Sequence, residues 1–232
     1  MARGGRQAHQ LPPGRHGLPR SFVAQNQRER ILAAVADVTS AASYAEMSVA
    51  DIIVTAGISR RTFYEHFKNK DEAFLAAYDE AAGQMLTAVR AAYASHQGFA
   101  ERMRAGIEAF LGLLAADPAF ARMCIVEVMA AGPEAVKRRN AAMSAFADMI
   151  EENARQRLSQ PPPSKLTAET VVGGIYDVVY TRIQRGDVRM LPELAPELVQ
   201  TALVHYLGPE AAQGAEPPGP TQALAREAPG AA

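Results

Sequence analysis

The sequence contains a single cysteine, Cys124, among its 232 residues. One cysteine excludes an internal disulfide and any metal site built from several cysteines. No stretch approaches the roughly 20 apolar residues that a membrane-spanning helix needs. The N-terminus carries arginines without an apolar run behind them, so it does not fit a secretory signal. We therefore expect a cytoplasmic protein without a membrane partner.

The signatures of common enzyme classes are also missing. The sequence has no HExxH motif, no paired cysteines and no Gly-rich phosphate loop. Cys124 has no histidine nearby in the sequence to activate its thiol, although a distant one can approach in a fold. We expect no metal and no cofactor. An all-helical enzyme stays open as an alternative. The histidines are scattered at His9, His16, His66, His96 and His205.

Charge is unevenly distributed along a chain whose net charge is −1. Residues 1–70 hold ten Lys/Arg and five Asp/Glu, a net charge of +5. Residues 71–232 hold fourteen and twenty, a net charge of −6. A basic N-terminal part on a near-neutral chain indicates an anionic partner for that part. Uneven surface charge without a function is the other interpretation.

Apolar residues recur at helical spacing and no β-strand alternation is present, so the fold class is all-α. Residues 1–20 are rich in Gly, Pro, Arg and Gln, which predicts a disordered basic arm. This arm either reaches a DNA minor groove or has no role. From Gly208 onward Pro, Gly and Ala dominate, which predicts a disordered tail. Between them we expect a head at 21–70 and a helical body at 71–207, with the tail at 208–232.

Helix start and stop signals divide the head and the body. The first helix of the head should end near Ala42, and the segment SQPPPSK at 159–165 cannot be helical. The later helices are expected from Asn69 to about Ser95, from near Phe99, from Asp117-Pro118, from Gly132-Pro133 to about Leu158, from Thr167 to about Arg185, and from Pro196 to about Leu207.

The most informative stretch is SVADIIVTAGISRRTFYEHFKNK, residues 48–70. Ser48 with Asp51 forms a capping-box pattern ahead of an apolar-periodic run. Gly57 stands where a helix end needs a residue that accepts a positive φ, and Ser59 can cap the next helix. Two short helices joined by a Gly-containing turn make a helix-turn-helix, whose second helix can lie in the DNA major groove.

The second of these helices has Phe63 and Phe67 on its inner face and hydrogen-bond donors on its outer face. Recognition helices read bases with their N-terminal residues, where Arg60 and Arg61 stand. A guanidinium can donate two hydrogen bonds to guanine, and phosphate contact is the competing role. Candidate DNA-binding residues are Ser48, Ser59, Arg60, Arg61, Thr62, Tyr64, His66 and Lys70.

Ser48 and Lys70 each mark a helix N-terminus, where free backbone N–H groups bind phosphate readily. We interpret both as clamps that fix register and carry no sequence information. Thr62 can offer its methyl group to thymine or its hydroxyl to phosphate.

The segment AGISRRTFYEHFKNKDE resembles the signature of the TetR family of bacterial one-component transcriptional regulators, and the similarity covers residues 26–80. The resemblance implies a homodimeric transcriptional regulator, most often a repressor, that binds double-stranded operator DNA. It implies phosphate contacts for Tyr64 and His66, with core packing and a bond to a neighbouring carbonyl as the respective alternatives. The sequence departs from the family at Ser43-Tyr44, a place after the first helix that often holds glycine.

The resemblance also implies an effector pocket in the helical body. Methionine adapts to varied ligands, and the body is rich in it. We expect a small, largely apolar effector, and ordinary core packing is the alternative for each candidate residue. The candidate pocket residues are Phe110, Met123, Met143, Phe146 and Tyr180. Polar residues on otherwise apolar helices, which either line the pocket or face solvent or an interface, are Cys124, Glu127, Asn140, Tyr176, Asp177, Tyr180 and Arg182.

In the family the last two long helices pair with their copies in a homodimer. Gly173 and Gly174 lie inside a predicted helix, where each costs about 1 kcal/mol against alanine. Close approach of a partner helix would offset this cost, and a local kink is the alternative. A helical interaction module without a ligand is a third functional alternative. The possible packing faces carry Ile175, Val178, Val179, Leu198, Ala202 and Tyr206.

Overall fold

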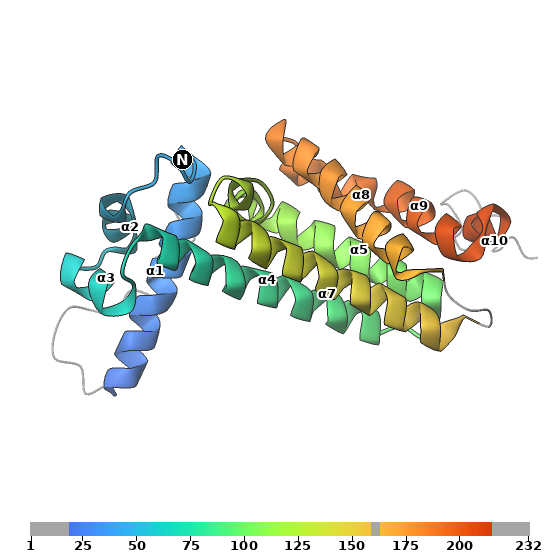
Figure 1. Cartoon of the computed structure of the whole chain (residues 1–232), viewed down its shortest axis with the longest axis horizontal. Helices are drawn as coiled ribbons and strands as arrows, with labels where there is room; N and C mark the ends of the chain where they lie inside the picture. Colours follow the sequence, from blue (N-terminus) through green and yellow to red (C-terminus); the bar gives the residue numbers. More distant parts are fainter. Residues whose placement is uncertain (1–18, 159–162, 215–232) are drawn as a thin grey trace, which may run out of the picture. The chain divides into compact units, whose positions relative to one another are not determined.

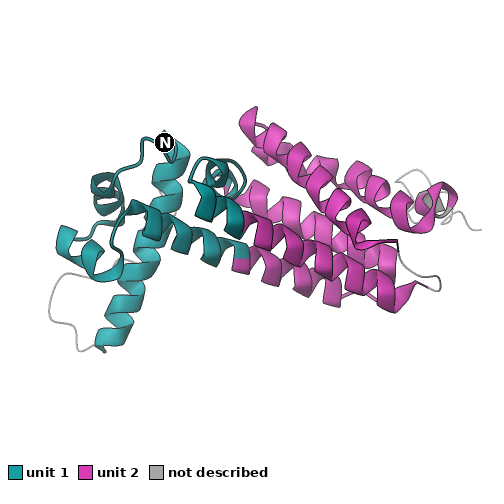
Figure 2. Ribbon diagram, in the orientation of Figure 1, with its two compact units in different colours: residues 1–82, 118–138 teal, residues 83–117, 139–232 magenta. Residues whose placement is uncertain are grey.

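The computed structural model describes residues 19–158 and 163–214, and within these ranges every regular element is helical. The predicted arm and most of the predicted tail lie outside them. Two compact units are present, one made of residues 1–82 and 118–138 and the other of 83–117 and 139–232 (Figure 2). The head predicted at 21–70 lies within the first unit, which also includes residues 71–82 and 118–138.

Unit 1 begins with α1 (Arg20–Ala42), α2 (Val49–Ala56) and α3 (Arg60–His66), which pack on one another (Figure 1). Their core holds Ile31, Val35, Ile52 and Phe63, all fully buried. Ile31 and Val35 lie four apart on α1, as do the buried Ile52 and Ala56 on α2, so each of these helices turns one apolar face inward. The end of the first helix at Ala42 is confirmed.

The local signals of the helix-turn-helix are confirmed. The Ser48 side chain accepts from the Asp51 N–H, and the Asp51 carboxylate accepts from the Ser48 N–H at 3.0 Å, which completes the capping box. Gly57 ends α2 with φ 61° and ψ 42°, a left-handed conformation that glycine adopts without penalty. Ser59 caps α3 by accepting from the Thr62 N–H at 3.0 Å.

Ser43, which follows α1, has a strained backbone with φ 77° and ψ 162°. This region of backbone space is essentially restricted to glycine, and another residue held there costs about 1–3 kcal/mol. Ser43 N–H nevertheless donates to the Thr39 carbonyl at 3.0 Å, so the turn keeps its hydrogen bond. The departure from the family pattern is thus a site of stored strain.

Replacing Ser43 by glycine should raise the free energy of unfolding of unit 1 by about 1 kcal/mol, because the relief of strain exceeds the added entropy of the unfolded chain. Denaturant unfolding followed by circular dichroism measures the change. Ser48→Gly is the contrasting variant, since Ser48 has φ −118° and caps α2, so this change relieves no strain and should lower the stability. Equal or lower stability of Ser43→Gly would contradict the assigned conformation.

The remainder of unit 1 comes from the start of α4 (Lys70–Ala94) and from residues 118–138. A helix at Pro118 was predicted, but the α-helix α6 (Pro118–Ala121) lasts only to Ala121. It continues as a π-helical turn η2 (Arg122–Val126) and a 3-10 turn η3 (Glu127–Met129). Both α6 and η2 pack against α1. The wider π-turn replaces the regular hydrogen-bond pattern that the sequence signal implied.

Unit 2 contains the ends of α4 and α7 (Pro133–Arg157), together with α5 (Phe99–Ala116), α8 (Lys165–Gln184), η4 (Val188–Leu194) and α9 (Ala195–Leu207). Packing between these helices uses aromatic rings. Phe99 on α5 meets Tyr206 on α9 with ring centroids 5.1 Å apart. The Tyr93 ring lies against Gly106, where an added Cβ would stand 1.9 Å from a ring carbon. Glycine is therefore required at residue 106 by close approach.

Two predicted boundaries in unit 2 are corrected. Thr167 lies inside the first turn of α8, since Ser164 is the residue that precedes the helix. Residues Pro209–Gly214 form α10, whereas disorder was predicted from Gly208. Proline at the start of α10 and the strong helix propensity of alanine explain this helix, and Ala212 is buried.

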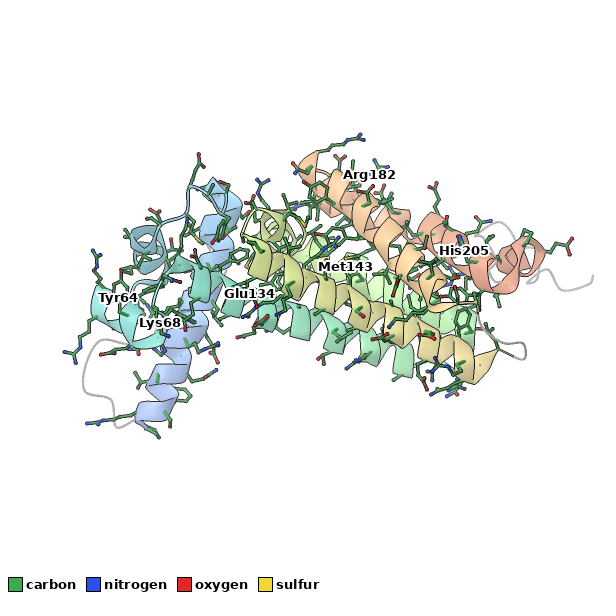
Figure 3. All side chains as sticks on the ribbon, in the orientation of Figure 1. Tyr64, Lys68, Glu134, Met143, Arg182 and His205 are labelled. Atoms are coloured by element: carbon green, nitrogen blue, oxygen red, sulfur yellow. The ribbon has the colours of Figure 1, made fainter. Side chains whose placement is uncertain are left out.

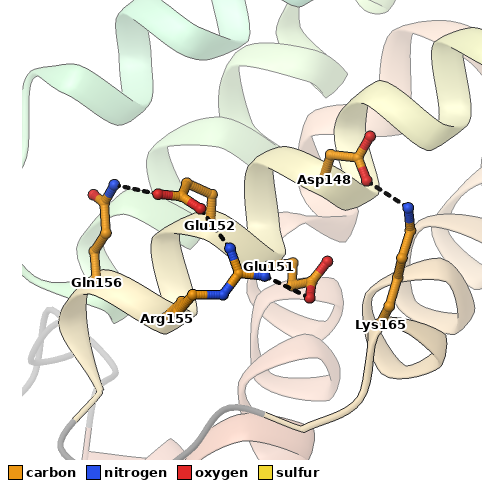
Figure 4. Close-up of polar contacts among 6 residues, drawn as sticks. All are labelled: Asp148, Glu151, Glu152, Arg155, Gln156 and Lys165. Carbon is orange, nitrogen blue, oxygen red and sulfur yellow. Dashed lines mark hydrogen bonds and ion pairs between the residues drawn. The ribbon is translucent and has the colours of Figure 1, made fainter.

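Surface ion pairs lie along α7 in unit 2, and one of them joins α7 to α8 (Figure 4). Lys165 Nζ donates to Asp148 Oδ1 at 2.8 Å, and Arg155 pairs with Glu151 and Glu152, each at 2.7 Å.

Over residues 19–158 and 163–214, no single helix is long and apolar enough to span a membrane, although α5 and the segment to Met129 reach that length together. Within the same residues no cluster of His, Cys, Asp or Glu could hold a metal ion.

Candidate DNA-binding site

The outer face of α3 presents charged and aromatic side chains to solvent. The Arg61 side chain is 89% exposed and is restrained only by an ion pair with Glu65 at 2.9 Å. The Arg60 guanidinium lies over the Tyr64 ring, 5.8 Å from its centroid. Tyr64 and Lys68 project from α3 and from the turn after it (Figure 3). Because Phe63 on the opposite face is fully buried, the helix keeps this orientation.

At the start of α3, Ser59 and Thr62 are bonded to each other. Their hydroxyl oxygens lie 2.8 Å apart, and the Ser59 oxygen also accepts the Thr62 N–H. These bonds use the same groups that could otherwise contact a phosphate or base. Both residues therefore hold the helix end that carries Arg60 and Arg61, whose guanidinium groups make only surface contacts with Tyr64 and Glu65 within the described residues.

At the start of α2, Asp51 occupies the helix N-terminus that Ser48 was predicted to offer to phosphate. The pKa of Asp51 is lowered by the hydrogen bond from the Ser48 side chain and further by the Ser48 N–H. An ionised carboxylate at this position satisfies the N-terminal donors and offsets the positive end of the helix dipole. Less of the N-terminus of α2 is then available to an anion.

His66 and Lys70 face other parts of the head. His66 Nε2 lies 3.5 Å from Gln27 Oε1 on α1. Lys70 Nζ donates to the carbonyls of Tyr44 at 3.1 Å and Met47 at 2.9 Å, and lies 4.8 Å from the Tyr44 ring centroid. The Lys70 ammonium is thus turned toward the loop between α1 and α2. Its backbone N–H at the start of α4 is the group that fits the predicted clamp.

The structure reveals two residues that hold the helix-turn-helix in place and that the sequence did not indicate as part of the site. Arg30 on α1 donates to the Gly57 carbonyl at 2.8 Å and so ties α1 to the turn of the helix-turn-helix. Tyr44 donates its hydroxyl to Asp71 Oδ1 at 2.6 Å, and its ring meets Phe74 edge-on with centroids 4.8 Å apart. Burial, and then the Asp71 carboxylate, raise the pKa of Tyr44. These partners lie 27 residues apart in sequence, so no local pattern marks them.

The candidate pocket residues are divided between the two units. Phe110 on α5 and Phe146 on α7 meet within unit 2, with ring centroids 6.1 Å apart. The Tyr180 hydroxyl accepts from Gln184 Nε2 at 2.9 Å. Met143 is half-buried on α7 (Figure 3). Met123 is buried in η2 and belongs to unit 1.

Unit 1 also has an open concavity of about 790 Å³ beside α4. Four of its charged lining residues form ion pairs, because Arg28 Nη1 lies 3.4 Å from Glu80 and Arg138 pairs with Asp79. Burial raises the pKa of Asp79, and the Arg138 charge opposes that effect. The lining also contains the carboxylates of Asp71 and Glu72, which accept hydrogen bonds from the Tyr44 hydroxyl and the Lys68 N–H.

Comparison with known proteins supports the interpretation of α2 and α3 as a DNA-binding helix-turn-helix. The family described as bacterial regulatory proteins, tetR family, matches residues 31–77, which include α2 and α3. The HTH-type transcriptional activator FasR of Mycolicibacterium smegmatis is 23% identical over 145 residues, covering 62% of this chain and 66% of that protein. The chain therefore spans just under two thirds of the length of this relative.

Solved structures share the fold across most of the described chain. The fatty acid degradation regulator FadR of Bacillus halodurans is 19% identical with a TM-score of 0.70, covering 76% of this chain and 94% of that one. FadR of Bacillus subtilis, solved in complex with stearoyl-CoA, is 20% identical with a TM-score of 0.67, covering 78% and 98%. SmeT, the repressor of the Stenotrophomonas maltophilia multidrug efflux pump SmeDEF, is 20% identical with a TM-score of 0.66, covering 84% and 96%.

The all-α fold and the exposed basic helix of unit 1 define a DNA-binding regulator of transcription with a helix-turn-helix. Residues 31–77, which contain the helix-turn-helix, match the tetR family of bacterial regulatory proteins. Members of this family act as DNA-binding transcription factors, which excludes the all-helical enzyme.

Proposed function

We propose that this regulator binds an inverted-repeat operator as a homodimer and releases it when an apolar effector enters the helical body. The observation that carries the DNA-binding part is the exposed N-terminal half of α3, where the Arg61 side chain is 89% exposed and held by a surface ion pair, while Ser59 and Thr62 are bonded to each other. A two-fold dimer presents two such helices, so its site should have matching half-sites.

Within this proposal the contacts divide into two kinds. Arg60 and Arg61 read base edges in the major groove, where a bidentate contact with guanine is available to each. Tyr64, His66 and the backbone N–H of Lys70 contact phosphates and set the register, whereas the Ser48 N–H is already bonded to the Asp51 carboxylate. Selection of duplexes from a random pool tests the proposal. We expect symmetric half-sites about one helical turn or more apart, and an asymmetric or absent motif would contradict it.

The homodimer is proposed to form through α8 and α9. Among the residues that the structure describes, a Cβ added to Gly173 or Gly174 would meet nothing within 4 Å, so both glycines border open space there. Leu166 on α8 and Val204 on α9 are exposed apolar residues that a partner would cover. Two of the residues named for the packing faces, Val179 and Ala202, lie in the core of the chain itself and cannot contribute.

The effector site is proposed from unsatisfied polar groups in unit 2 as well as from its apolar residues. Asn153 on α7 is 4% exposed, and within the described residues neither its Nδ2 nor its Oδ1 has a hydrogen-bond partner. The same holds for the buried hydroxyl of Tyr206, and burial raises the pKa of that residue to about 12. Buried polar groups without partners are uncommon and call for a water or a ligand.

The first effector to test is a long-chain acyl-CoA, because the similar FadR of Bacillus subtilis was solved with stearoyl-CoA. Its chain suits the apolar contacts of Phe110 and Phe146, and its polar part can pair with a carboxamide such as that of Asn153. We propose repression that the effector relieves. The relative FasR is an activator, so transcription from a promoter with and without the operator decides the direction.

Asn153→Leu should raise the stability of the ligand-free protein and weaken its response to stearoyl-CoA. An unsatisfied buried group costs about 1–3 kcal/mol, and leucine of similar volume removes that cost. Thermal unfolding and operator titrations with and without stearoyl-CoA measure the two effects. Asn140→Leu, at an exposed position on the same helix, is the control and should change neither. An unchanged response of Asn153→Leu to an effector that acts on the unmodified protein would reject this site.

A further inference from the structure

Glu127 is a buried carboxylate that joins two remote segments of unit 1. It is 4% exposed. Its Oε1 pairs with Arg122 Nη2 at 2.8 Å, and its Oε2 accepts the backbone N–H of Tyr44 at 2.8 Å. Burying a carboxylate is costly unless both oxygens find donors, and removing one partner leaves the charge uncompensated. Glu127 is therefore held strongly in this geometry.

The π-helical turn accounts for the Arg122–Glu127 pair. The Glu127 N–H donates to the Arg122 carbonyl, which closes a turn five residues long. In an α-helix, at about 100° per residue, side chains five apart would lie on different faces. The wider π-turn brings them onto one face, so the guanidinium neutralises the carboxylate that reaches Tyr44. The π-helical turn is thus what allows the Arg122–Glu127 ion pair to form.

The backbone that Glu127 holds is the loop at 43–48, between α1 and α2. The same loop is held from the other side by α4, because Lys70 Nζ bonds to the carbonyls of Tyr44 and Met47, and Asp71 accepts the Tyr44 hydroxyl. The loop leads directly into α2 and from there into α3. Its position is set by side chains from two segments rather than by its own sequence.

We propose that Glu127 is a positioning residue for operator binding, which holds the Tyr44 backbone and makes the geometry of α2 and α3 depend on residues 118–129. Residues 118–138, which contain this segment, are connected at both ends to unit 2, so a change in the body is covalently linked to them. When the Glu127–Tyr44 bond is lost, the loop is free to move and operator affinity falls. The regulatory part of this inference rests on the proposed function. The positioning part depends on DNA binding alone.

Coupling of this kind is measurable as a ratio of affinities. If two arrangements of residues 118–129 differ in the Glu127–Tyr44 bond, operator DNA favours the arrangement that has it. An effector that favours the other then weakens operator binding, and by reciprocity the operator weakens effector binding by the same factor. Loss of Glu127 removes the difference between the arrangements and should bring that factor toward one.

The test compares Glu127→Leu with Glu134→Leu in the full chain. Glu134 is an exposed carboxylate in the same part of unit 1, where Arg138 Nε lies 3.5 Å from its Oε1 (Figure 3). Three measurements are made below the unfolding temperature: operator affinity, hydrogen exchange at the Tyr44 amide, and the change in operator affinity on adding stearoyl-CoA. For Glu127→Leu we expect affinity lower by about tenfold, a size typical of coupled sites, and faster exchange at Tyr44. Glu134→Leu should match the unmodified protein in all three.

A structural role alone would lower the unfolding temperature and leave the operator affinity of the folded protein unchanged, and that result overturns the proposal. If Glu127→Leu does not fold, Glu127→Asp keeps the charge and withdraws it from Tyr44, with the same expected fall in operator affinity and the same faster exchange. Unchanged values for Glu127→Asp likewise overturn the proposal. If stearoyl-CoA has no effect on the unmodified protein, the choice of effector fails, and operator affinity and Tyr44 exchange still decide whether Glu127 positions the head.

Discussion

Replacing Arg60 and Arg61 singly by alanine should reduce discrimination between the operator and a duplex changed at one base pair by about 1–3 kcal/mol for at least one of the two variants. Arg61 is the more accessible side chain, because only an exposed ion pair with Glu65 restrains it. Such a pair contributes about 0–1 kcal/mol and is easily exchanged for a base. Arg60 must leave the Tyr64 ring, so its substitution should also disturb the phosphate contact proposed for Tyr64.

Titrations of each variant against the operator and against singly changed duplexes, at fixed salt, measure this effect. Loss of a base contact flattens the preference at particular positions, whereas loss of a phosphate contact weakens all duplexes alike and reduces the salt dependence. Arg185→Ala, at an exposed position of unit 2, is the control and should bind like the unmodified protein. Full discrimination in both the Arg60 and the Arg61 variants would assign base reading to other residues.

The helix-turn-helix was predictable because its signals are local. Ser48 with Asp51, Gly57, and Ser59 with Thr62 each act over three residues or fewer, and the structure gives every one the expected cap or turn. Caps can be predicted because the first backbone N–H groups of every helix have no partner within the helix and need a nearby acceptor. Residues that face outward from such a motif follow from the helix period alone.

The residues that position the motif were not predictable in the same way. Tyr44 and Glu127 are 83 residues apart, and their contact requires the chain to return to unit 1 after α5. Glu127 had the appearance of a polar residue on an apolar helix, since the π-turn that buries it with Arg122 has no sequence signature. Lys70 was interpreted through the start of its helix, yet its ammonium group bonds to loop carbonyls. In each case a distant partner decided the role.

The proposed dimer surface on α8 carries two glycines that contacts within the described residues do not explain. Gly106 has a reason within the chain, because the Tyr93 ring occupies the space of its Cβ. Gly173 and Gly174 have none, since nothing within 4 Å opposes a side chain at either position. Two glycines in α8 cost about 1 kcal/mol each in helix propensity, and the chain itself offers no compensating contact. A second copy of the chain is the partner that we propose.

Gly174→Phe should therefore raise the dissociation constant of the dimer by tenfold or more, about 1.4 kcal/mol, while the subunit still folds. The Cβ of the new side chain meets no described atom of its own subunit within 4 Å, so we expect the loss to arise between subunits. Gly83→Phe is the matched control, since Gly83 also lies within a helix with nothing near its Cβ. Light scattering across a dilution series measures both. A monomer for the unmodified protein at micromolar concentration, or equal dissociation of the two variants, would rule out an interface at Gly174, and with it the reason proposed here for two adjacent glycines in α8.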